Sequence, residues 1–148
     1  MSEIAKRTSK NAGDAGEYYV AYMLSKLGIS AALTTSGSSA VDIIATIDGS
    51  KSISIQVKGS WARTQPRQWM VGKHIPTNSP DYFYVFCNMS EDISHKNIPE
   101  VFIVPSEIVA SQSTWQHTVP LFKIGKGEDS KYLDRWDFIQ SALAHAPS

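Results

Sequence analysis

The first strong pattern in the chain is the stretch NAGDAGEYYVAYMLSKLG, residues 11–28, in which apolar residues recur at helical spacing. Val20 and Leu24 share one stripe of this helix, and Glu17 lies on the same stripe. Gly28 follows the last apolar residue, where a left-handed C-cap belongs. We therefore expect a helix that packs on a sheet and directs one carboxylate toward it.

Two glycines, Gly13 and Gly16, lie inside this predicted helix. A glycine in a helix is unfavourable by roughly 1 kcal/mol relative to alanine. Their presence indicates that another backbone or a ligand comes close to the helix.

Alternating apolar and polar residues predict two strands, 40–47 and 51–58, joined by an Asp-Gly turn that is typical of a hairpin. Counting outward from that turn places Asp42 opposite Gln56, within a residue or two. Because side chains alternate between the two faces of a strand, Gln56 and Lys58 share one face. The hairpin is thus expected to bring Asp42, Gln56 and Lys58 together at one end.

The remaining pattern predicts three more strands and two helices, and it leaves residues 61–80, which mix aromatic, basic and proline residues, unassigned. The strands are expected at 30–35, 81–88 and 100–105, and the helices at 106–112 and 130–144. This order predicts an α/β or α+β layer fold with a mixed sheet. We expect one domain over residues 1–148, with 1–10 as a flexible N-terminal arm.

Composition fits such a domain, since 42% of the 148 residues are apolar and 19% are charged. No long apolar run or secretory signal is present, so we expect a cytoplasmic protein. The single cysteine, Cys87, lies in an apolar run and is expected to be a buried, inert thiol.

The net charge is zero, which argues against unspecific binding of polyanions by the whole chain. The charges are nevertheless uneven. Residues 1–75 carry nine cations and five anions, whereas residues 76–148 carry five and nine. Such a distribution allows a basic working face beside an acidic one.

The polar residues of the hairpin and first helix suit a hard divalent cation, which prefers oxygen ligands. Asp42 and Glu17 can supply carboxylates, Gln56 an amide oxygen and Val57 a backbone carbonyl, while the ammonium of Lys58 can orient a nucleophile or balance charge. The alternative is that Gln56 and Lys58 are a solvent-exposed pair. Glu17 could likewise be a first-turn carboxylate favoured by the helix dipole. Asp42 is harder to explain in that way, because aspartate is depleted in strands and costly to bury alone.

The motifs GE (16–17), VDI (41–43) and QVK (56–58), in this order over about residues 11–60, resemble the PD-(D/E)xK nuclease superfamily, in particular its Mrr-like restriction endonucleases and Holliday-junction resolvase relatives. The resemblance implies a restriction-endonuclease-like αβββαβ core with a central mixed sheet flanked by helices. It also implies cleavage of DNA with Mg²⁺, or Mn²⁺ in its place. Asp42 and Gln56 would be metal ligands, Lys58 the catalytic lysine, and Glu17 a further acid.

The chain departs from the family pattern at two positions. Val41 stands in place of the proline, and Gln56 stands where many members have an acid, which removes one negative charge from the site. Glu17 would restore a second carboxylate.

We therefore expect a Mg²⁺-dependent DNA endonuclease, with Arg63, Arg67 and Lys73 as candidate contacts to DNA phosphates. Cutting both strands would call for a two-fold homodimer. The alternative is a catalytically decayed nuclease-fold module that binds DNA or another protein. A toxin or immunity role in a defence system also stays open.

Overall fold

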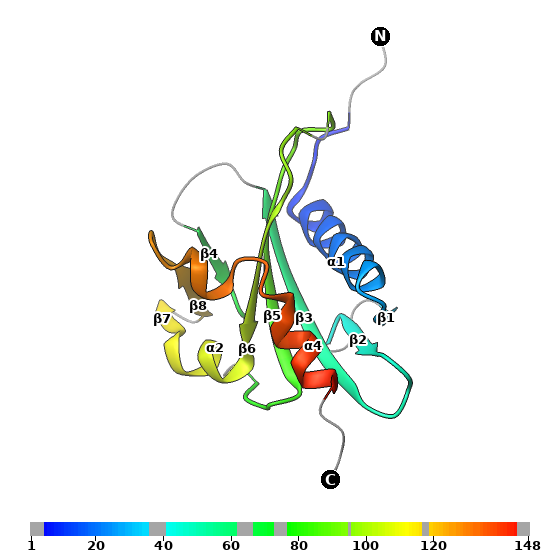
Figure 1. The fold of residues 1–148 in the computed structure, drawn as a ribbon. Helices are drawn as coiled ribbons and strands as arrows, with labels where there is room; N and C mark the ends of the chain where they lie inside the picture. Colours follow the sequence, from blue (N-terminus) through cyan, green and yellow to red (C-terminus); the bar gives the residue numbers. More distant parts are fainter. Residues whose placement is uncertain are drawn as a thin grey trace.

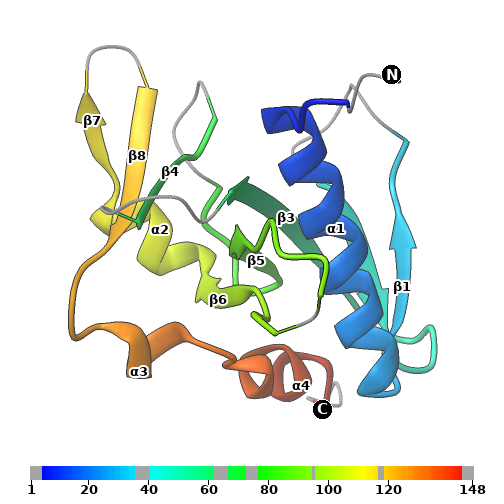
Figure 2. The same ribbon diagram turned by 90° about the horizontal axis from the view of Figure 1, so that it is seen from above.

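A mixed sheet of five strands forms the centre of the molecule, with helices on both of its faces (Figures 1 and 2). The computed structural model describes residues 5–35, 41–61, 67–72, 77–94, 96–116 and 119–144. In chain order the elements are α1 (Ser9–Lys26), β1 (Ser30–Leu33), β2 (Ile43–Thr46), β3 (Ser52–Trp61), β4 (Arg67–Met70), β5 (Tyr82–Met89), β6 (Glu100–Pro105), α2 (Ser106–Gln112), β7 (Thr114–Gln116), β8 (Val119–Ile124), α3 (Asp129–Tyr132) and α4 (Trp136–Ala144).

Helix α1 begins at Ser9, two residues before the predicted range and inside the segment 1–10 that was expected to be an arm. A capping box fixes its start: Thr8 Oγ1 accepts a hydrogen bond from the Asn11 N–H, and the Thr8 N–H donates to Asn11 Oδ1. The helix ends as predicted, since Gly28 has a left-handed φ of 79°.

The hairpin forms as predicted, with β2 and β3 antiparallel and Ile43 opposite Ile55. Strand β2 is shorter than expected and β3 longer, because β3 continues to Trp61 beside β5. The turn between them contains Gly49 at a φ of 86°, which glycine adopts without strain. Continuing the register by one residue brings Asp42 beside Gln56.

Strand β5 is buried along its whole length and pairs with β3 in parallel and with β6 antiparallel, giving the order β1-β2-β3-β5-β6. This confirms the predicted mixed sheet flanked by helices. One connection differs from the αβββαβ order. Within its described residues, the link from β3 to β5 carries β4, a strand of a second sheet, and no helix.

The core has two parts, one on each face of the central sheet. On the first face Ile55 and Val57 pack with α1 and α4. On the second face Tyr84 and Phe86 pack with the second sheet, whose order is β4-β8-β7, and with α2 and α3. Cys87 is fully buried on the first face, as predicted.

The C-terminal region differs from its prediction as one helix over 130–144. It forms two helices, α3 and α4, because the chain turns between them at Asp134, whose φ of 53° is left-handed. In the described parts of the chain, no helix has the length and apolar character needed to cross a bilayer.

Candidate active site

Asp42 lies immediately before β2, where its backbone and side chain both contact β3. Its N–H donates to the carbonyl of Ile55 at 2.9 Å, and its carboxylate Oδ2 accepts from the N–H of Val57 at 2.7 Å. Among the described residues, no donor forms a hydrogen bond to the other carboxylate oxygen, Oδ1. The side chain is therefore fixed by one oxygen while the other is available to a ligand.

The carbonyl of Val57 is directed to the same edge of β3 as the Asp42 carboxylate. In an extended strand the N–H and the C=O of one residue point to the same side. Because the Val57 N–H donates to Asp42, the carbonyl of Val57 also faces the β2 side of the strand. Two oxygen donors, one from each arm of the hairpin, thus lie at this edge.

Gln56 and Lys58 project from the sheet face opposite α1, beside Tyr84 and Phe86 in the parallel register of β5. Both side chains are partly buried. The Gln56 amide oxygen accepts a hydrogen bond from the Tyr82 hydroxyl at 3.2 Å. An amide oxygen has two lone pairs, so this bond orients the group and leaves one lone pair for a cation.

Glu17 comes to the sheet on α1, and the two glycines expected to allow close approach have different roles. A Cβ on Gly16 would lie 3.3 Å from Val57 Cγ1, so Gly16 lets the helix settle on β3. A Cβ on Gly13 would meet no atom within 4 Å. A third glycine, Gly59 in β3, makes the closest contact, with the backbone of Ala12.

The charges of the site interact across the sheet edge. Burial raises the pKa of Asp42, opposed by the hydrogen bond from Val57 and by the charge of Lys58. Burial also raises the pKa of Glu17, and the negative charge of Asp42 raises that pKa further. Burial lowers the pKa of Lys58, opposed by the charge of Asp42. Asp42 at the edge therefore interacts with an acid from the α1 side and an amine from the other side.

This donor set fits a hard divalent cation. Burial raises the pKa of two partly buried carboxylates, Asp42 and Glu17, more than nearby cations lower it, and no described residue forms a hydrogen bond or ion pair with the carboxylate of Glu17. The described residues contain no group of three or more His, Cys, Asp or Glu side chains placed to hold a metal. A cation at this edge would therefore need the neutral oxygens of Gln56 and Val57 besides Asp42 and Glu17.

Of the three residues predicted to contact DNA phosphates, one lies among the described residues. Arg63 and Lys73 lie outside the described residues. Arg67 is only 6% exposed, and its guanidinium donates to Asp129 at 2.5 Å and lies 3.6 Å from Glu100. The structure thus pairs the buried guanidinium of Arg67 with two partly exposed acids, where it is not available to a phosphate.

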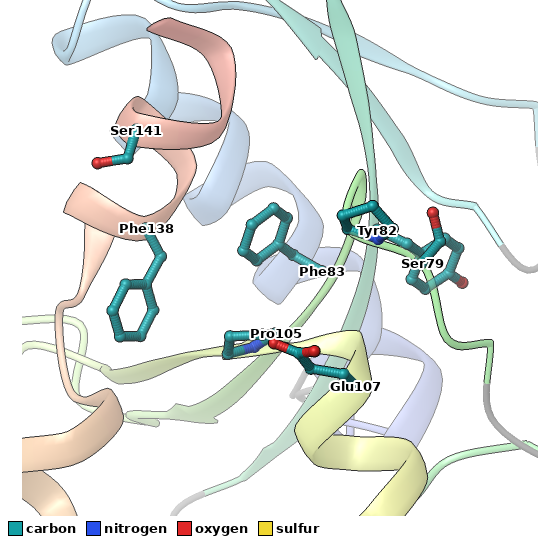
Figure 3. Close-up of a pocket in the computed structure, with 8 residues that line it drawn as sticks. Ser79, Tyr82, Phe83, Pro105, Glu107, Phe138 and Ser141 are labelled. Carbon is teal, nitrogen blue, oxygen red and sulfur yellow. The ribbon is translucent and has the colours of Figure 1, made fainter. Parts of the chain in front are cut away.

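A pocket of about 240 Å³ lies beside Tyr82, between α4, the start of β5 and the end of β6 (Figure 3). Its walls are mainly apolar, with the rings of Phe83 and Phe138 and with Pro105, and Glu107 lies at its rim. None of Glu17, Asp42, Gln56 and Lys58 lines it. Of the residues that line it, Tyr82 also contacts the candidate active site, through its hydrogen bond to Gln56.

Sequence reasoning missed Tyr82 as a neighbour of Gln56. Tyr82 occupies an apolar strand, and nothing in that pattern distinguishes its hydroxyl from those of the other tyrosines. Only the parallel pairing of β3 with β5, which brings Ser54 opposite Tyr82, places the hydroxyl near the amide.

Comparison with solved structures identifies the fold. A bacterial homing endonuclease, I-Ssp6803I, aligns with a TM-score of 0.63 over 94% of this chain and 96% of that protein, at 16% sequence identity. The chain has the PD-(D/E)xK nuclease fold. A second nuclease with this fold, the Holliday junction resolvase Hjc of Archaeoglobus fulgidus, aligns with a TM-score of 0.48 at 12% identity, over 91% of this chain and 98% of that one.

Neither a protein-family model nor a curated protein matches the sequence. The likeness to nucleases therefore comes from the arrangement of the strands and helices and from the short GE, VDI and QVK motifs. Those motifs lie on α1, at the start of β2 and on β3 of the nuclease fold, which is the order the resemblance implied.

Proposed function

We propose that this chain is a Mg²⁺-dependent DNA endonuclease. The observation that carries the proposal is the position of Asp42, which is bonded to β3 through one carboxylate oxygen and interacts electrostatically with both Glu17 and Lys58. The nuclease fold supports it, because the three motifs occur on the elements where that fold carries its site.

Each residue has a role that follows from its chemistry. Asp42, Glu17, the amide oxygen of Gln56 and the carbonyl of Val57 would hold the cation. Bound Mg²⁺ would polarise the phosphodiester and promote ionisation of the attacking water. The ammonium of Lys58 would orient that water and offset the negative charge that develops on the phosphate oxygens. Tyr82 would keep the Gln56 amide in place through its hydrogen bond.

The proposal is tested by incubating supercoiled plasmid and a branched DNA junction with the protein and Mg²⁺ or Mn²⁺. We expect the wild type to nick or cut at least one of them, and Asp42→Asn and Lys58→Ala to lose that activity by about 10²-fold or more. Asp48→Asn in the hairpin turn and Lys51→Ala before β3 are matched controls, since they change the same charges on the same hairpin.

Two results would contradict the proposal. One is that wild type leaves every DNA intact with both metals. The other is that Asp42→Asn and Lys58→Ala cut as well as their controls. DNA binding that persists without any cleavage would favour the alternative of a decayed nuclease-fold module that binds DNA.

A two-fold dimer would give the proposed enzyme one site for each strand of a duplex. Sedimentation velocity with and without a duplex tests this. A protein that makes double-strand breaks in one binding event is expected to sediment as a dimer on DNA.

A further inference from the structure

A cleft of about 580 Å³ lies beside the candidate active site, between the end of β3 and the second sheet. Lys58 and Ser60 line it from β3, and Gln68, Met70 and Val119 line it from β4 and β8. In Figure 2 the end of β3 points toward β4 of the second sheet. The lysine of the proposed site is therefore also a wall residue of a cleft that leads to the second sheet.

The residues on the far wall belong to the outer face of that sheet. Along β4 the side chains of Gln68 and Met70 are exposed, whereas Arg67 and Trp69 are buried. Gln68 pairs with Lys123 of β8 in register, so their side chains lie next to each other on this outer face. Lys123 is exposed and makes no ion pair with any described residue.

This outer face suits a polyanion. In the described residues, neither the cleft lining nor the outward positions of β4, β7 and β8 include a carboxylate, whereas Lys58 and Lys123 supply positive charge. Two acids near the second sheet, Glu100 and Asp129, are instead paired with buried Arg67. Their negative charges are thus offset by a buried cation.

We infer that the outer face of the β4-β8-β7 sheet binds duplex DNA next to the cleavage site, with Gln68 and Lys123 facing the nucleic acid. An antiparallel ribbon fits the major groove, and an amide and an ammonium side by side are groups that read base edges. This inference rests on the proposed function, because it assigns a binding surface to the same nuclease.

The test measures binding without cleavage. A fluorescent 25-base-pair duplex is titrated with the full chain in EDTA at several salt concentrations, and binding is followed by anisotropy. We expect Lys123→Ala to weaken binding by about three- to tenfold. It should also make the slope of log K against log salt concentration shallower by about one. Lys131→Ala, an exposed lysine on α3, is the matched control and should bind like wild type.

Gln68→Ala tests base reading separately. Selection from a randomised duplex pool should return a different or broader set of sequences for Gln68→Ala than for wild type, with no change in the salt dependence. Thermal unfolding of each variant verifies that it is folded.

Three outcomes distinguish this inference from the proposed function. If wild type cuts DNA but Lys123→Ala and Gln68→Ala bind and select like wild type, the surface inference is wrong and the enzyme proposal stands. If Met70→Glu converts a dimer to a monomer while DNA binding is unchanged, the face is a contact between copies of the chain. If Lys123→Ala loses affinity while no metal supports cleavage, the surface holds and the catalytic proposal fails.

Discussion

The backbone carbonyl of Ala12 in α1 lies so close to Gly59 in β3 that a Cβ at residue 59 would be 2.4 Å from its oxygen. No side chain separates the helix from the strand at this point. The contact is about one and a half turns before Glu17 along α1 and next to Lys58 along β3. It therefore sets how far the helix that carries Glu17 stands from the sheet edge at Asp42.

Gly59→Ala should destabilise the protein by about 2 kcal/mol or more, because the new methyl group meets a backbone atom that has no rotamer to change. Gly13→Ala is the matched control. Gly13 lies on α1, and a Cβ there would meet no atom within 4 Å. We therefore expect Gly13→Ala to stabilise the protein by up to about 1 kcal/mol. Urea unfolding of both variants tests this. Equal stabilities would show that α1 can move off β3 without cost.

Lys58→Met should make the protein more stable while abolishing cleavage. Burial lowers the pKa of Lys58 more than the attraction of Asp42 raises it, so the folded state disfavours the charged ammonium. An apolar side chain of similar length removes that cost, and we expect a gain of about 0.5–1 kcal/mol in the free energy of unfolding. Lys131→Met should stay near wild type. A loss of stability in Lys58→Met would show that the folded protein needs the positive charge of Lys58 beside Asp42.

The sequence allowed prediction of those features that depend on neighbouring residues. The Asp-Gly turn set the hairpin register, and the register brought Asp42 to Gln56. The second sheet could not be foreseen, because β4 pairs with β8, more than fifty residues later along the chain, and neither strand has a strong pattern of its own. For the same reason Arg67 was expected to contact DNA phosphates, whereas its guanidinium is buried and pairs with acids on β6 and α3.

The C-terminal helix shows a different limit. The apolar residues of 130–144 recur at helical spacing on both sides of Asp134, so the pattern predicts one helix. The left-handed backbone at Asp134 is set by tertiary pairing, since its N–H donates to the carbonyl of Val101 in β6. Helical periodicity has no information about such a contact.

Tyr82→Phe should lower the turnover of the proposed nuclease by about tenfold and affect DNA affinity much less. The hydroxyl of Tyr82 donates to the Gln56 amide oxygen, and without it the amide can rotate away from the cation. Single-turnover cleavage at saturating protein, compared with binding in EDTA, separates the two effects. Tyr132→Phe in α3 makes the same chemical change far from Gln56 and should cut like wild type. A Tyr82→Phe variant with unchanged turnover would remove Tyr82 from the site.

Asp129→Asn should reduce stability in a pH-dependent way. The hydrogen bond from Arg67 lowers the pKa of Asp129 below its ordinary value, so the ion pair stabilises the fold above that value and is lost as the pH falls through the folded pKa. At pH 7 we expect a loss on the order of 1 kcal/mol, because water partly screens the half-exposed carboxylate. The difference from wild type should shrink as the pH is lowered from about 5 to 3.

Urea unfolding at each pH measures this difference. Asp137→Asn, which breaks an exposed pair with Arg135, is the control and should change little at any pH. A constant difference for Asp129→Asn across the pH range would contradict the ion-pair explanation.

Cys87 provides a direct readout of whether α1 stays on the sheet. The thiol is fully buried, burial raises its pKa to about 12, and a Cβ on Gly16 of α1 would lie 3.6 Å from its sulfur. Alkylation at pH 8 should therefore be slower in the folded protein than in urea by about 10³-fold or more, since it needs an opening of the structure. Gly59→Ala should speed it, and Gly13→Ala should not. Because the same opening would separate Glu17 from Asp42, the variants that label fastest should also lose the most cleavage activity. Fast labelling of a fully active protein would mean that Glu17 is not needed at the site.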